Sequence, residues 1–137
     1  MCGEKNLAKL IATMTPVLAE CEYIFGTLSS YDYEQLTLLN PISTFQEKEG
    51  VSVILTKEKA DEFKIPYSGV FKCITLNVHS SLDAVGLTAA VSTKLTQSNI
   101  SANVVAAHYH DHVFVASKDA EQALTDLNAL AKCGIQS

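Results

Sequence analysis

Apolar residues recur along the chain with two different spacings, one typical of helices and one typical of strands. Apolar positions three and four residues apart predict helices over residues 6–14, 57–63, 83–98 and 119–132. Alternating or β-branched runs predict strands over residues 22–28, 42–47, 51–55, 71–78, 100–108 and 113–116. The Glu49-Gly50 pair lies between two of these strands and predicts a hairpin turn, and Thr56 is expected to cap the helix that follows. The pattern predicts a mixture of helices and strands in alternation.

The same order of elements occurs twice. Ser29–Thr37 aligns with Ser80–Thr88 through the shared pattern S-S-x-D-x-x-x-L-T, and each copy follows a predicted strand. Further along, residues 51–58 align with residues 113–119 if one residue is skipped. Two matches in the same order indicate an internal repeat.

The first copy is the shorter one by roughly ten residues. A full amphipathic helix follows Leu87, whereas the chain reaches Asn40-Pro41 soon after Leu36, and proline does not continue a helix. We therefore expect the first module to have lost most of its first helix. The helix over residues 6–14 is predicted to cover the sheet face that this loss would expose. The expected domains are residues 1–67, the N-terminal helix plus an abridged module, and residues 68–137, a complete module.

Each copy has the order β-α-β-β-α-β, abridged in the first. This order predicts an α+β fold of two tandem ferredoxin-like modules, each an antiparallel sheet with helices on one face. Residues 74–116 resemble the ACT domain, a small-molecule-sensing module of amino-acid biosynthetic enzymes such as aspartokinase. The residues that carry this resemblance are Asp83-Ala-Val-Gly86-Leu87 at the strand-to-helix turn and Asn99-Ile-Ser-Ala-Asn103 before the next strand. The whole chain is similar to short bacterial proteins made of two ACT modules.

Composition narrows the classes of partner. The net charge is −5, and all ten basic residues are lysine, so bidentate arginine contacts to phosphate or guanine are excluded. No run approaches the roughly 20 apolar residues of a membrane span, and the first residues have no export signal, so a cytoplasmic protein without nucleic-acid or membrane partners is expected. Cys2, Cys21, Cys73 and Cys133 are widely spaced and are interpreted as reduced thiols that mostly pack.

The candidate ligand site is the turn that contains Gly86. In the predicted helix, backbone N–H groups from Val85 to Leu87 lie in the first turn, at the positive end of the helix dipole, where they have no intrahelical partners. A glycine inside a helix costs about 1 kcal/mol relative to alanine, which either the approach of a ligand carboxylate or tight packing would explain. Ser80-x-x-Asp83 also fits a capping box, so a purely structural role stays open.

An amino acid fits this turn, with its carboxylate at the helix start and its ammonium group on Asp83 or Asp32. The expected ligand-binding residues are His79, Ser80, Ser81, Asp83, Val85, Gly86, Leu87, Ser101 and Asn103. The resemblance implies that such ligands bind where two ACT modules meet, near Asp83, Gly86 and Leu87, with Asn103 on the adjoining strand. Replacing Gly86 by valine is expected to abolish binding and leave the fold intact.

Three histidines offer a competing interpretation. His108, His110 and His112 alternate, which on one strand would give a set of zinc or nickel ligands. The repeat aligns residues 109–111 with the turn at residues 48–50, and a turn there would break the alternation and leave a solvated hairpin tip or an interface. No nucleophile elbow, phosphate loop, dinucleotide fingerprint or zinc-protease motif is present, so neither catalysis nor a cofactor is expected.

The sequence therefore predicts a regulatory module that binds a small molecule, an amino acid above all, and acts through ligand-dependent assembly or contact with a partner. A homodimer and a partner protein are both compatible with this role. Two alternatives stay open: a structural or protein-interaction module without a ligand, and a metal-binding protein that uses the His108–His112 hairpin.

Overall fold

The computed structural model describes residues 7–78 and 86–133. The helices are α1 (Leu7–Thr13), α2 (Tyr33–Leu39), α3 (Lys57–Glu62), α4 (Leu87–Gln97) and α5 (Ala120–Cys133), the last preceded by a 3-10 turn at Ser117–Asp119. The strands are β1 (Thr15–Leu28), β2 (Ser43–Gln46), β3 (Val51–Thr56), β4 (Phe71–Asn77), β5 (Asn103–Ala106) and β6 (Asp111–Ala116). The fold is a mixture of antiparallel sheet and helices, as the sequence predicts.

The chain forms two compact units. The middle unit comprises residues 20–71, and the terminal unit comprises residues 1–19 together with residues 72–137. Strand β1 contributes residues to both, because it begins in the terminal unit and continues into the middle unit. The sequence predicts only the second part of this strand, residues 22–28. Pro16 was expected to end the helix predicted over residues 6–14. The structure places Pro16 at the second position of the strand, an end position that tolerates proline.

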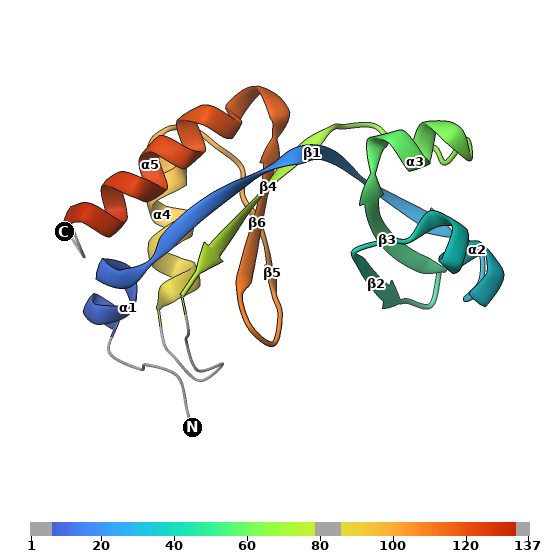
Figure 1. Ribbon diagram of the computed structural model, residues 1–137, viewed down its shortest axis with the longest axis horizontal. Coiled ribbons are helices and arrows are strands. Elements are labelled where there is room, and N and C mark those ends of the chain that lie inside the picture. The colour runs from blue at the N-terminus through green and yellow to red at the C-terminus, as the bar shows by residue number, and fades with distance from the viewer. Residues whose placement is uncertain (1–6, 79–85, 134–137) are drawn as a thin grey trace. The chain divides into compact units, whose positions relative to one another are not determined.

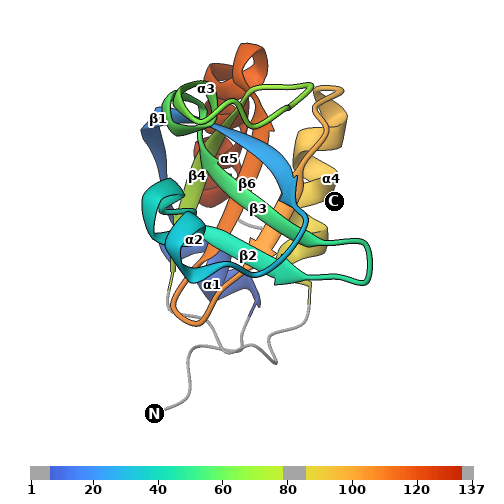
Figure 2. The same ribbon diagram turned by 90° about the vertical axis from the view of Figure 1, so that its right-hand side faces the viewer.

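In the middle unit, β3 lies between β2 and β1, and both pairings are antiparallel. Figure 2 shows β2 and β3 as a hairpin, with α2 nearby. Alternate residues of the strands point into the core with Leu39 of α2 and Ala60 of α3; these are Ile24, Leu28, Val51, Val53 and Leu55. The predicted hairpin is confirmed, and so is the cap of α3, because Thr56 Oγ1 accepts a hydrogen bond of 3.3 Å from Lys59 N–H.

In the terminal unit, the strand order is β1, β4, β6, β5, with β5 at the edge. Figure 1 shows α4 and α5 on one face of these strands. Within the described residues no strand follows α5, so the β-α-β-β-α-β plan has no last strand of its own. The first residues of β1 lie beside β4, where that plan puts its last strand. The N-terminal part of the chain therefore completes the C-terminal module.

Helix α1 belongs to the terminal unit, and the prediction that it covers the first module is wrong. Leu10 and Ile11 are fully buried, Met14 is nearly so, and all three lie in the same core as α4, α5, β4 and β6. The helix packs against α5 and α4. The apolar face of α1 was predicted correctly. It packs against the terminal unit, whose sheet includes the first residues of β1, the strand that follows α1.

The first module keeps a short helix after its first strand. Helix α2 has seven residues, whereas α4 has eleven in the corresponding place. It ends at Asn40, which has the left-handed conformation (φ 47°) common at helix ends and donates its N–H to Leu36 O. Pro41 follows at once. The abridgement predicted from Asn40-Pro41 therefore corresponds to the loss of roughly one helical turn rather than of most of the helix.

Candidate ligand site at the start of helix α4

Helix α4 begins at Leu87, and Gly86 is its N-cap residue with φ 96°. The predicted helix began at Asp83, which lies outside the described residues together with His79, Ser80, Ser81 and Val85. Gly86 therefore precedes the helix instead of lying inside it. Its positive φ is a conformation that residues with a Cβ rarely adopt, which supplies a first reason for glycine at this position.

The N-terminal turn of α4 has no side-chain cap within the described residues. The first intrahelical bond runs from Ala90 N–H to Gly86 O at 2.8 Å, so the N–H groups of Leu87, Thr88 and Ala89 precede it and have no partner in the helix. Leu87 is buried, whereas Thr88 and Ala89 are exposed. These groups carry the positive end of the helix dipole. Such a turn can accept an anion.

The corresponding turn of the first module is closed by its own side chain. Asp32 is the N-cap of α2, and its Oδ1 accepts hydrogen bonds from Glu34 N–H (2.9 Å) and Gln35 N–H (3.2 Å). The aspartate of the repeated S-S-x-D pattern thus satisfies the helix start in the first copy. In the second copy the helix start has shifted three residues further from the aligned Asp83. Of the two aspartates considered for an ammonium group, Asp32 uses its Oδ1 to cap α2.

Helix α1 lies close to the Gly86 turn. A Cβ on Gly86 would lie 2.8 Å from Leu7 Cδ2, which is shorter than a normal contact. The missing Cβ of Gly86 therefore makes room for Leu7, so tight packing accounts for part of what the sequence suggested for a ligand. The expectation that Gly86→Val leaves the fold intact needs correction, because valine would meet both Leu7 and an unfavourable φ.

Ser101 and Asn103 lie at the opposite end of α4. Both follow the end of the helix, and eleven helical residues span about 16 Å. Both residues are exposed, and Asn103 Nδ2 donates a hydrogen bond of 3.3 Å to Phe114 O across the β5–β6 pair. The structure thus brings Gly86 and Leu87 together but separates them from Ser101 and Asn103.

The end of the terminal unit that carries Gly86 also carries the β5–β6 turn, which the set of expected ligand-binding residues omits. In Figures 1 and 2 the start of α4, the end of β4 and the β5–β6 turn lie at the same end of the unit. Ala107 N–H donates a hydrogen bond of 3.1 Å to His110 O and closes this turn. The rings of His108 and Tyr109 contact each other edge to face, with 4.7 Å between their centroids. The sequence did contain a signal for this turn, because the repeat aligns residues 109–111 with the turn of the first hairpin at residues 48–50.

Burial shifts the pKa of two side chains in this hairpin, Asp111 and His112. His112 Nδ1 lies 2.9 Å from Thr75 Oγ1 of β4, and burial, aided by nearby His110, lowers the pKa of His112. Burial raises the pKa of Asp111, although His112 and His110 oppose that rise. His110 Nδ1 is buried and has no hydrogen-bond partner within the described residues.

The histidines do not form a metal cluster in the described part of the chain. No group of three His, Cys, Asp or Glu side chains is close enough there to hold an ion. The turn at residues 107–110 breaks the alternation on which the metal interpretation depends.

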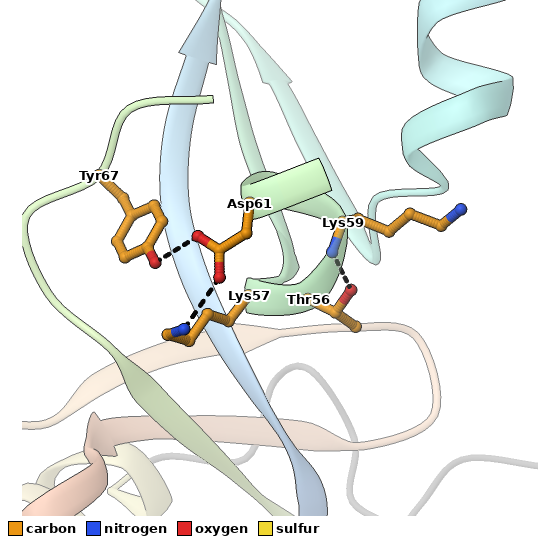
Figure 3. A network of polar contacts seen from close by, with 5 residues as sticks. All are labelled: Thr56, Lys57, Lys59, Asp61 and Tyr67. Atoms are coloured by element: carbon orange, nitrogen blue, oxygen red, sulfur yellow. Dashed lines mark hydrogen bonds and ion pairs between the residues drawn. The ribbon is translucent and has the colours of Figure 1, made fainter. Parts of the chain in front are cut away.

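The middle unit has a polar cleft that the sequence did not indicate. Its volume is about 460 Å³, and it is lined by Cys21, Glu22, Thr56, Lys57, Glu58 and Asp61. Asp61 dominates it, because its Oδ1 accepts from Tyr67 Oη (2.7 Å) and its Oδ2 from Lys57 Nζ (2.9 Å), as Figure 3 shows. These donors lower the pKa of Asp61, the Tyr67 hydrogen bond first. Each carboxylate oxygen accepts one hydrogen bond, so the network ties α3 to Tyr67.

Two family models match the chain. One ACT domain model matches residues 2–72, and a second matches residues 70–130. The chain belongs to the ACT domain family. The chain therefore contains two tandem ACT domains, and the resemblance drawn from the sequence is confirmed. The second ACT domain carries the Gly86 turn, and the first carries the Asp32 turn.

Solved structures with the same fold include one of similar sequence. A Vibrio cholerae protein of unknown function, described as a possible transport protein, is 45% identical with a TM-score of 0.83, over 93% of this chain and 97% of that one. The ligand-free regulatory subunit of Thermus thermophilus aspartate kinase is 11% identical with a TM-score of 0.64, over 91% of this chain and 98% of that one. Clostridium acetobutylicum aspartate kinase is 13% identical with a TM-score of 0.66, over 92% of this chain and 35% of that one. A search of curated proteins found no match.

ACT domains are typically regulatory modules that bind amino acids, and they commonly oligomerise. No helix in the described ranges is long and apolar enough to cross a membrane.

Proposed function

We propose that the second ACT domain binds a free amino acid at the start of α4 and that binding alters the assembly of the chain or its contact with a partner. The observation that carries the proposal is the first turn of α4, which has no side-chain cap among the described residues and includes the exposed residues Thr88 and Ala89. A carboxylate there would gain hydrogen bonds to N–H groups and a favourable interaction with the helix dipole.

The difference between the two repeats supports one site rather than two. In the first ACT domain, Asp32 already supplies the carboxylate that the helix start needs. In the second, the helix starts after Gly86, which has no side chain to serve as a cap. The ligand's carboxylate would take the place at α4 that the Asp32 carboxylate takes at α2. We propose Asp83 as the acceptor for the ligand's ammonium group, with His79, Ser80 and Ser81 as further contacts.

The test is a thermal-shift screen of the twenty amino acids on the full chain, followed by Asp83→Asn. An amino acid at about 100 times its dissociation constant stabilises the folded state by about 2.7 kcal/mol, which raises the Tm by about 5 °C or more. Asp83→Asn removes the charge that holds the ammonium group and is expected to reduce this rise by at least half. The reduction should be equal for every amino acid that binds.

The matched control is Asp32→Asn, the same change at the aligned position of the first repeat. Asparagine caps helices as well as aspartate, so this variant should keep both its Tm and the ligand-induced rise. If no amino acid raises the Tm, or if Asp32→Asn removes the rise while Asp83→Asn keeps it, the proposed site is wrong.

We propose the cytoplasm as the compartment. Cys21 is an exposed free thiol and Cys73 a buried one, which supports a reducing environment. Burial raises the pKa of Cys73 and keeps its thiol protonated and unreactive.

An interaction module is the second candidate function, favoured by the exposed apolar side chains of the first ACT domain.

A further inference from the structure

Helix α2 carries apolar side chains on two opposite sides. On one side, Leu39 is buried in the core of the middle unit, and the half-buried Leu36 packs against that core. On the other side, the helical spacing places Tyr33 and Leu38, which are 77% and 57% exposed. One apolar side is enough to hold a surface helix on its own core. A second apolar side, left exposed, marks a surface that contacts another molecule.

The outward side of α2 forms an open groove, called the α2 groove below. Its volume is about 370 Å³, and it is lined by Tyr33, Glu34, Thr37 and Leu38. Thr37 Oγ1 donates a hydrogen bond of 2.8 Å to Tyr33 O, so its proton is already used within the helix. Glu34 is the only charged residue of this lining. The α2 groove therefore combines apolar contact area with one negative charge.

An aromatic pair adjoins the α2 groove. The rings of Tyr31 and Tyr33 contact each other edge to face, with 5.3 Å between their centroids and 83° between their planes. Tyr31 is also exposed, so the pair is accessible from solvent. The face of a tyrosine ring attracts a cation, and Glu34, the next residue after Tyr33, adds an opposite charge. This combination favours an arginine or lysine side chain.

The charge of the whole middle unit favours the same partner. Residues 20–71 contain nine acidic residues and four lysines, so this unit carries a net charge of −5, which equals that of the chain. Residues 29–47, which include α2, contain no basic residue. Among the described residues, seven of the nine exposed large apolar side chains also belong to this unit. The unit with the exposed apolar surface is thus the acidic one.

We propose that the α2 groove binds a basic amphipathic segment of another protein. Apolar side chains of that segment contact Tyr33 and Leu38, and one of its arginines or lysines contacts the tyrosine rings and Glu34. A second copy of this groove would bring like charges together, and the same negative charge repels nucleic acids and anionic membranes. This inference deepens the second candidate function, an interaction module, and does not depend on the amino-acid site at α4.

The test is fluorescence anisotropy with a synthetic peptide of about 15 residues that has leucine on one helical side and arginine on the other. A fluorescent label blocks its N-terminus and an amide blocks its C-terminus, so it lacks the two charged groups that the site at α4 would bind. The full chain is expected to bind this peptide, more weakly as the salt concentration rises. A peptide with glutamate in place of every arginine should not bind.

A charge reversal locates the binding surface. Glu34→Lys reverses the charge of the α2 groove and is expected to weaken peptide binding by at least about fivefold. Glu58→Lys is the matched control, because it changes the net charge equally and Glu58, like Glu34, lies in the first turn of a short helix of the middle unit. The control should weaken binding by less than about twofold, the effect of net charge alone.

A second pair of variants tests the aromatic contact. Tyr33→Ala is expected to weaken peptide binding by about tenfold, with little change in Tm because the side chain is exposed. Phe45→Ala removes an aromatic side chain of similar exposure, 71%, that does not line the groove, and it should keep the affinity.

Three results would overturn the proposal. The full chain does not bind the basic peptide, it binds the acidic peptide equally well, or the two controls weaken binding as much as the groove variants do. A thermal-shift screen in which no amino acid raises the Tm counts against the site at α4 alone, so the two proposals fail separately.

Discussion

Ile11→Ala is expected to lower the free energy of unfolding by about 2–5 kcal/mol, although Ile11 lies near the start of the chain. Ile11 is fully buried in the core of the terminal unit, and its loss would leave a cavity beneath α4 and α5. Urea unfolding monitored by circular dichroism measures the change. In hydrogen exchange, the loss of protection should fall on α4 and α5 rather than on β2 and β3.

The control is Ala12→Ser, a change on the exposed side of the same helix, which should alter stability by less than about 0.5 kcal/mol. If Ile11→Ala is as mild as the control, or if its loss of protection falls on β2 and β3, then α1 does not stabilise the second ACT domain.

Gly50→Ala is expected to destabilise the chain by at least about 2 kcal/mol. Gly50 closes the β2–β3 hairpin with φ 153°, and a Cβ there would lie 2.5 Å from the carbonyl oxygen of Leu28. A backbone oxygen on a paired strand cannot move aside as a flexible side chain can. Leu28 pairs with Val51, so the strain would act directly on the β1–β3 ladder. Thermal unfolding measures the effect as a fall in Tm.

Gly69→Ala is the matched control for this substitution. Gly69 has no positive φ, and a Cβ there would meet only ring carbons of Phe71, the nearest at 3.3 Å. Its effect should stay within about 1 kcal/mol, and it could be stabilising, because alanine reduces the freedom of the unfolded chain. Equal effects of the two substitutions would show that the hairpin geometry is not a constraint.

The features that the sequence predicted correctly depend on neighbouring residues. The cap by Thr56 involves a residue three positions away, and the turn at Gly50 joins strands only a few residues apart. The apolar face of α1 likewise follows from local spacing. Its partner does not, because an amphipathic face only shows that something must cover it. The partner depends on β1, because α1 packs in the unit that the first residues of β1 join. The fourteen residues of β1 belong to both units, and the sequence has no signal at the point where one unit ends and the other begins.

The candidate site shows the same limit. The repeated S-S-x-D pattern aligns the two helix starts, but α4 begins only at Leu87, after a glycine with φ 96°. The amino-acid type alone does not determine this backbone conformation. The prediction adds Ser101 and Asn103 to Gly86 as a polar lining of the ligand site, and the ACT resemblance implies that Asn103 lies on the adjoining strand. A helix separates what lies at its two ends, and the β5–β6 turn instead shares the Gly86 end.

The most direct measurement of amino-acid binding is a titration followed by backbone amide NMR on the full chain, with the amino acid selected by the thermal screen. Leu87, Thr88 and Ala89 should show the largest amide shifts, because their N–H groups would gain a charged acceptor. Glu34 and Gln35, whose N–H groups Asp32 already holds, should shift little. Saturable shifts centred elsewhere, with the amides of α4 unchanged, would contradict the account.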